Sequence, residues 1–177
     1  MQLKNHVCLM AKYNQAMNQN LYEIAKGLSP EQLLHDSGAF FGSIWGTLNH
    51  IAVGDTIWLK RISPFLTSNE ALSAIEALPQ PTALDAVICT DLAELSERRA
   101  LLDDAICRMA QAITDEELDR PVKYHNMKGQ PFSKQLFSLL MHLFNHQTHH
   151  RGQVTTLLSQ MGVEYGVTDL LVSIPES

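Results

Sequence analysis

The chain has 177 residues, 45 % of them hydrophobic, which is enough for one domain with a full core. Its 13 basic and 19 acidic residues give a net charge of −6, and the basic residues are scattered, so no nucleic-acid partner is expected. We expect no signal peptide and no membrane span, because no segment approaches about 18 uninterrupted apolar residues. Three cysteines without CxxC spacing fit reduced thiols. These features predict a single cytoplasmic domain, residues 1–177.

Four stretches of the chain carry apolar residues at alternating spacings of three and four. They cover about 3–24, 43–62, 88–113 and 134–161. This period buries one face of each helix against the others. The pattern predicts an all-α fold, a four-helix bundle.

The segments between these stretches predict smaller elements. Ser29–Gln32 and Thr114–Glu117 read as capping boxes, and each is expected to start a short extra helix. Residues 63–82 contain three prolines and predict a long crossover between helices two and three, because bundle loops usually have about 2–8 residues. Residues 122–133, centred on Lys128-Gly129, are interpreted as a small hairpin.

Each apolar stripe is interrupted near its midpoint by polar residues. These are Asn14, Asp55, Arg99 and the pair His146 and His150. A buried neutral polar group without a partner costs roughly 1–3 kcal/mol, so a polar layer in four helices predicts a site. The alternative is a structural network, such as an ion pair between Asp55 and Arg99. Under the site interpretation, Asn14, Asp55 and Arg99 are candidates to line a pocket.

Four of the eight histidines lie between positions 142 and 150. His146 and His150 are spaced i, i+4, so both side chains project from one helix face and can chelate one ion. His50 is the best candidate for a third ligand, because it lies midway along the second helix. Gly46 and Gly54 flank it one turn away on either side, leaving room for close packing or for a molecule beside a metal.

The remaining histidines of the cluster receive a different interpretation. His142 and His149 are expected to point away from the apolar stripe, with His149 on the surface. A zinc protease is excluded, because Gln147 stands where the HExxH motif needs glutamate. Ferritin-like di-iron sites are excluded because the paired ExxH motifs are missing.

The combined motifs resemble those of a known family. FFGSIWGTLNHIAVGDTIWLKRI (40–62) and HLFNHQTHHRGQV (142–154), with MAKYNQAMNQNLY (10–22) and GLSPEQL (27–33), resemble the DinB family of DinB/YfiT-like metalloenzymes. The resemblance implies a four-helix bundle with one long crossover. It also implies a metal triad, which maps onto His50, His146 and His150.

The resemblance carries further expectations about function. Related proteins include transferases and isomerases that depend on a low-molecular-weight thiol, and family members lean toward homodimers. The family name refers to damage-inducible expression, not to DNA contact. Zinc is the first choice of metal, and nickel, iron and manganese also suit imidazole ligands. We predict a metal-dependent enzyme of unidentified substrate, either a thiol-dependent transferase or a hydrolase-like enzyme. The alternatives are a non-enzymatic metal or small-ligand binding module and a stress-response interaction protein.

Overall fold

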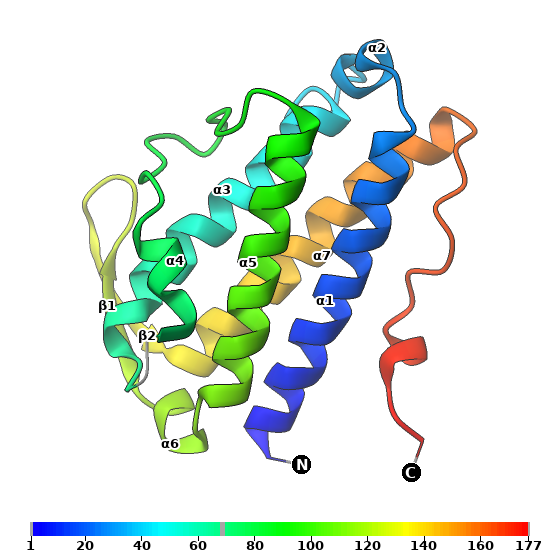
Figure 1. Cartoon of the computed structure of the whole chain (residues 1–177). Helices are drawn as coiled ribbons and strands as arrows, with labels where there is room; N and C mark the ends of the chain where they lie inside the picture. The colour runs from blue at the N-terminus through cyan, green and yellow to red at the C-terminus, as the bar shows by residue number, and fades with distance from the viewer. Residues whose placement is uncertain (1, 68–69, 177) are drawn as a thin grey trace.

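The computed structural model describes residues 2–67 and 70–176. Four long helices form a bundle, which confirms the predicted fold class (Figure 1). They are α1 (Leu3–Lys26), α3 (Ile44–Ile62), α5 (Leu92–Ala112) and α7 (Leu136–Gln160). Helices α3 and α5 run in one direction, and α1 and α7 run in the other (Figure 1).

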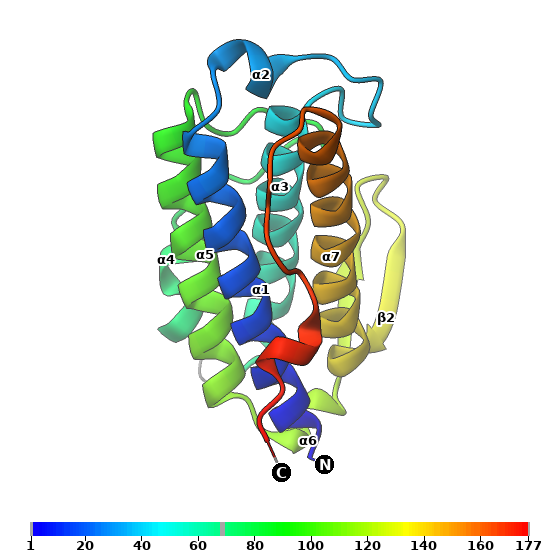
Figure 2. The ribbon, with the colours of Figure 1, turned by 90° about the vertical axis from the view of Figure 1, so that its right-hand side faces the viewer.

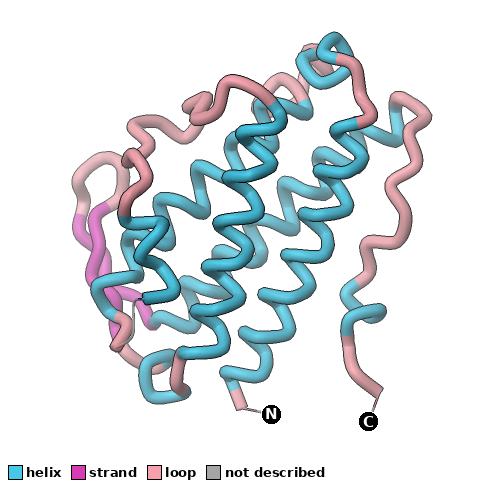
Figure 3. The backbone as a smooth tube through the Cα atoms, viewed as in Figure 1, coloured by secondary structure: helices cyan, strands magenta, loops and turns pink. Residues whose placement is uncertain are grey.

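Short helices occupy the connections and the C-terminal segment (Figure 3). They are α2 (Pro30–Leu34), α4 (Ser73–Glu76), α6 (Asp115–Leu118) and the 3₁₀ helices η1 (Ser63–Phe65), η2 (Glu70–Leu72) and η3 (Leu170–Ser173). Both predicted capping boxes are confirmed. The side chains of Ser29 and Gln32 cap α2 reciprocally, and those of Thr114 and Glu117 cap α6 in the same way.

The crossover between α3 and α5 is longer than the sequence indicated. It covers residues 63–91, because α5 begins at Leu92 and not near Ile88. Asp91 is the residue that starts the helix: its side chain accepts the Glu94 backbone N–H at 2.9 Å. Ile88 belongs to the crossover, where its backbone N–H donates to the Asn49 side chain of α3 at 3.2 Å. The apolar period continued past the true helix start, and only the cap marks the boundary.

The predicted hairpin is confirmed between α6 and α7. Strands β1 (Pro121–His125) and β2 (Pro131–Gln135) are antiparallel, with Lys123 opposite Ser133. Gly129 has a φ of +76° in the turn, a conformation that favours glycine. The hairpin lies beside α7 on the outer side of the bundle (Figure 2).

The C-terminal segment folds back along the outside of α1 and α7 (Figure 2). The Tyr13 hydroxyl donates to the Thr168 carbonyl at 2.6 Å, and the Asn20 amide donates to the Tyr165 carbonyl at 2.7 Å. Cys8, Cys89 and Cys107 are free thiols. Among the described residues, no helix is both long enough and apolar enough to cross a membrane.

Candidate metal centre

Three histidines from two helices meet on one side of the bundle. His50 projects from α3, and His146 and His150 project from one face of α7. One ring nitrogen of each lies within 4.8 Å of the other two. The Nε2 atoms of His50 and His146 are 2.9 Å apart. The three residues that the spacing singled out are therefore brought together in space.

Hydrogen bonds fix the tautomers of two of these rings. His50 Nδ1 lies 2.7 Å from the carbonyl oxygen of Leu84, which only accepts, so Nδ1 carries the proton and Nε2 has a lone pair. His150 Nδ1 lies 2.8 Å from Gln153 Oε1, and the Gln153 amide nitrogen lies 3.3 Å from His149 Nε2. With this amide orientation His150 also presents Nε2 as an acceptor. Outer partners of this kind typically orient metal-binding histidines.

The donor set fits a divalent ion. A tetrahedral zinc site with Zn–N bonds of about 2.0–2.1 Å places its nitrogens roughly 3.3 Å apart. The His50–His146 separation of 2.9 Å is shorter than this, and all three ring nitrogens lie within 4.8 Å of one another. The lone pair of His50 Nε2 faces His146 Nε2 across 2.9 Å. It accepts the proton when His146 carries one at Nε2, and a cation can take the place of that proton when His146 is in the other tautomer. These residues can therefore hold a metal ion.

The electrostatics of the site keep the imidazoles neutral. Burial, together with the neighbouring histidines, His150 first, lowers the pKa of His146 to about 3. Burial also lowers the pKa of His50 and of His150. Neutral imidazole is the form that binds a metal.

The two glycines of α3 serve different purposes. A Cβ atom on Gly54 would lie 2.8 Å from His146 Cε1, so glycine makes room for a candidate ligand. A Cβ on Gly46 would clash with the Phe41 carbonyl oxygen, so that glycine permits close backbone packing. The packing interpretation is correct for Gly46, and the site interpretation fits Gly54.

An aromatic side chain covers one face of the centre. The Phe41 ring stacks on His50 with centroids 3.8 Å apart and planes 18° apart. The Phe41 and His150 rings meet in an edge-to-face arrangement with centroids 5.5 Å apart. His50 and His150 are only 5 % and 8 % exposed, so water reaches the ring nitrogens mainly from one side. That side is a cavity of about 550 Å³.

The prediction that His142 and His149 point away from the site is wrong. Both line the same cavity as His50, His146 and His150. His142 precedes His146 by four residues, about 40° around a helix, and their ring centroids are 6.0 Å apart. His149 is exposed, as expected, and its ring lies 4.8 Å from that of His150 at the cavity edge.

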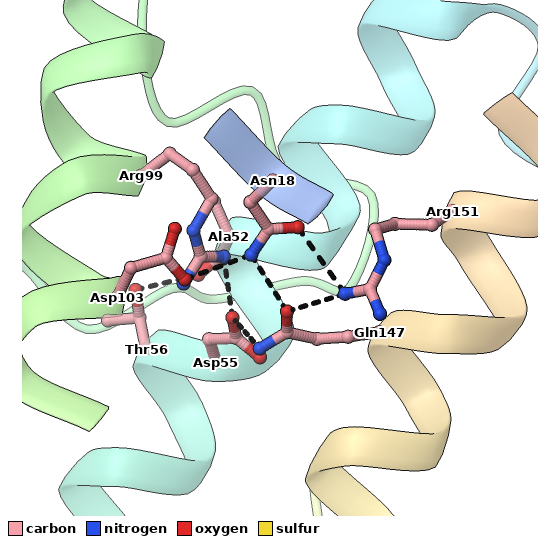
Figure 4. A network of polar contacts seen from close by, with 8 residues as sticks. All are labelled: Asn18, Ala52, Asp55, Thr56, Arg99, Asp103, Gln147 and Arg151. Carbon is pink, nitrogen blue, oxygen red and sulfur yellow. Dashed lines mark hydrogen bonds and ion pairs between the residues drawn. The ribbon is translucent and has the colours of Figure 1, made fainter. Parts of the chain in front are cut away.

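A buried polar network crosses the bundle beside this centre (Figure 4). Arg99 donates to Asp55 Oδ2 at 2.6 Å, and its second amino group lies 3.0 Å from Asp103 Oδ1. Gln147 donates to the same Asp55 oxygen and accepts from Asn18, both at 2.9 Å. The members of this polar network are Asn18, Asp55, Arg99, Asp103, Gln147 and Arg151.

The charges of the polar network balance. It contains two arginines and two aspartates; Arg99 pairs with both aspartates, and Arg151 donates to Gln147 at 3.1 Å. Burial raises the pKa of Asp103 to about 6, with Arg99 opposing the shift, and burial likewise raises that of Asp55. The two carboxylates outweigh burial and raise the pKa of Arg99, which keeps its charge. The network therefore links the four long helices in the bundle interior without a net charge.

The predicted polar layer is correct in part. The structural interpretation of the Asp55–Arg99 pair is confirmed. Asn14 is buried but makes no side-chain hydrogen bond within the described residues, and Asn18 one turn later takes its place. His146 faces the cavity, and its neighbour Gln147 joins the network. Asn14, Asp55 and Arg99 do not line the cavity, so their predicted role there is wrong.

Sequence reasoning missed the residues that support the ligands. Gln153 could have been found from its spacing, since it lies i+3 from His150 on the same helix face. The Leu84 carbonyl had no such signal, because it belongs to the irregular crossover. Asn18 and Asp103 also carried no signal beyond their position on helices.

A helical bundle with three histidines open to a cavity defines the class: a helical protein whose site can hold a metal ion. The chain belongs to the DinB family, whose model matches residues 1–175. It is 27 % identical over 158 residues to Protein DinB of Bacillus subtilis (strain 168). These residues cover 89 % of this chain and 87 % of that protein. No solved structure matches it. The resemblance of the motifs is thus confirmed.

Proposed function

We propose that this protein is a metal-dependent enzyme that holds one divalent ion through His50, His146 and His150. The observation that carries the proposal is the orientation of these rings. His50 and His150 are tied at Nδ1 to outer acceptors, and their Nε2 atoms are left for an ion beside the cavity. Three protein ligands with an open side are typical of catalytic rather than structural sites.

The cavity is the second support for catalysis. Its volume of about 550 Å³ lies within the range of small-molecule sites, roughly 300–1,000 Å³. A divalent ion supplies Lewis-acid chemistry there and makes a bound water or thiol more acidic. The protein's own contribution is to exclude water from one face through Phe41 and to hold the imidazoles neutral. A storage site would have no use for such a cavity.

Zinc is the proposed metal, since it takes imidazole ligands at four-coordinate sites, and nickel, iron and manganese are the competitors. A low-molecular-weight thiol is a proposed co-substrate, on the strength of the family resemblance. The thiol binding site would be the open side of the three histidines. We further propose that the protein works in the cytoplasm, as a homodimer.

The test is elemental analysis of untagged protein, because an added histidine tag binds metal itself. We expect one divalent ion per chain. His50→Ala, His146→Ala and His150→Ala should each weaken binding by more than the roughly 10–100-fold contributed by outer partners. His142→Ala and His149→Ala, from the same cavity wall, should keep one ion per chain.

Three outcomes decide the proposal. Retention of metal in all five variants would show that the histidines do not form the site. Loss in His142→Ala or His149→Ala would assign the ligands to other members of the cluster. Tight metal binding without any small-molecule binding in the cavity would favour the non-enzymatic binding module. Circular dichroism of each variant confirms that the fold is kept.

A further inference from the structure

We propose that the substrate of this cavity is an anion, a carboxylate or phosphate carried on an apolar body, and that Arg61 binds its charged end. The inference deepens the proposed function, since it names the substrate class for the same cavity. It rests on the surroundings of Arg61 and on the charge of the cavity wall, and neither depends on a bound metal.

Arg61 stands in the cavity wall without a carboxylate partner. It is half-buried, and within the described residues it makes no ion pair and no side-chain hydrogen bond. Its guanidinium lies over two aromatic rings, 4.9 Å from the centroid of Trp58 and 5.4 Å from that of Tyr124. These rings fix the plane of the guanidinium and leave its N–H groups for a ligand.

The electrostatics agree with an uncompensated charge. Burial lowers the pKa of Arg61, and the only group that opposes the shift is Tyr124. A buried cation usually has a counter-ion, because removing a charge from water is costly. A bound anion would supply that counter-ion.

Within the described part of the chain, the lining of the cavity contains no negatively charged side chain. The chain contains 19 acidic residues, yet none of them lines the cavity. Its polar lining instead includes Arg61 and five histidines, which are His50, His142, His146, His149 and His150. A cavity that contains a cation and no carboxylate favours an anionic ligand over a cationic one.

The spacing of the cavity residues along α3 indicates how long the ligand is, and the aromatic wall between them indicates that its middle is apolar. His50, Gly54, Trp58 and Arg61 follow one another along α3 at one-turn spacing, and His50 and Arg61 are separated by about 16 Å of helix rise. Arginine side chains on a helix lean toward the N-terminus, which shortens the gap. The wall between the two ends is formed by Trp58, whose ring meets that of His142 at 5.1 Å. A ligand reaching from the three histidines to Arg61 would lie against this aromatic wall.

The experiment compares two ligands of equal shape, 4-phenylbutyrate and its neutral amide 4-phenylbutyramide. Isothermal titration calorimetry on the full chain, as purified and after chelator treatment, measures both affinities. We expect the acid to bind on the order of tenfold to a hundredfold more tightly, the range of a charge-assisted bond. Arg61→Gln should abolish the preference. Arg61→Lys keeps the charge without the planar fork and should retain part of it.

Lys134→Gln is the matched control, because Lys134 is an exposed cation of the neighbouring hairpin that does not line the cavity. It should leave the preference unchanged. Equal binding of acid and amide to the wild type would overturn the proposal. A preference that survives in Arg61→Gln but disappears with the chelator would place the anion on the metal instead. Failure to bind metal, seen in elemental analysis, would overturn only the proposed function, because the chelator-treated arm tests Arg61 independently.

Discussion

The polar network and the histidine cavity are built from neighbouring residues of the same helices, yet they have opposite properties. On α7, His146 faces the cavity and Gln147 faces the bundle interior. His150 and Arg151 repeat this division one turn later. Successive residues of a helix differ by about 100° in direction, so one segment serves two faces.

The difference between the two regions lies in what their polar groups bind. In the network, charges of both signs meet and the donors and acceptors are largely used by one another. In the cavity, groups outside the histidine triad bind the Nδ1 atoms of His50 and His150, and the Nε2 atom of His50 faces only another candidate ligand, His146. The network joins α3 and α7 through Asp55 and Gln147, and the spacing of these two helices brings the three imidazoles together.

The largest expected effect comes from breaking the network. Arg99→Met leaves Asp55 and Asp103 buried without their cation, and removing one partner of a buried ion pair costs about 3–5 kcal/mol of unfolding free energy. Urea unfolding measures the loss. Arg108→Met is the matched control, because Arg108 pairs with Asp104 on the exposed side of the same helix. It should cost less than about 1 kcal/mol, and equal losses would contradict the role of the network.

Substitutions at the two glycines of α3 should distinguish a loss of stability from a loss of metal binding. In Gly46→Ala the new Cβ meets the backbone of Phe41, and we expect a loss of about 3 kcal/mol, the upper end for forced overpacking. In Gly54→Ala the Cβ meets the His146 ring, which can turn aside. That variant should fold and lose metal affinity on the order of tenfold, because a displaced ligand no longer fits the ion.

Gly152→Ala is the control for both glycine variants, because nothing lies within 4 Å of a Cβ at this helical position. It should keep the metal and gain roughly 0.5–1 kcal/mol in stability. Unfolding by denaturant and metal content per chain give the two readouts. Unchanged metal affinity in Gly54→Ala would mean that the His146 ring position does not matter to the site.

Gln153 orients His150 through its amide oxygen, so removing that oxygen should affect metal binding and not the fold. Gln153→Ala should lower metal affinity by about 10–100-fold and leave the fold intact. Gln160→Ala, an exposed glutamine at the end of the same helix, is the control and should have no effect. Competition with a chromophoric chelator measures both affinities. A wild-type affinity in Gln153→Ala would show that His150 needs no outer partner.

The smallest expected effect is a shift in the pH dependence of metal binding. The metal competes with protons for neutral imidazole, and burial lowers the pKa of His50, His146 and His150 below the ordinary value. Protons therefore compete only at a lower pH than for free histidine. The metal should remain bound at about pH 6 and leave as the pH approaches about 4. Loss of half the metal above about pH 6.5 would contradict the lowered pKa values.

The same pKa values have a consequence for the metal-free fold. Below about pH 6.5 the unfolded chain takes up protons on these histidines that the folded chain does not, so falling pH destabilises the fold. Circular dichroism at each pH distinguishes this unfolding from release of the metal by an intact protein.

The sequence by itself determined the elements that depend on local spacing. Periods of three and four marked the four long helices, and the capping boxes at Ser29 and Thr114 marked two short ones. The i, i+4 spacing of His146 and His150 placed them on one face, and the central position of His50 identified the third member. The position of His142, i−4 from His146, was also present in the spacing, and its cavity contact follows from the same rule.

Only the tertiary structure decided which polar side chains meet. Asn14 and Asn18 lie on one face of α1, one turn apart, and the sequence cannot distinguish them because the choice depends on how far α1 slides along α7. The tautomer of His50 depends on the Leu84 carbonyl, which irregular backbone brings from 34 residues away. Local periodicity fixes the direction of a side chain around its own helix. Its partner is fixed by the relative positions of helices, which follow from packing across the whole core.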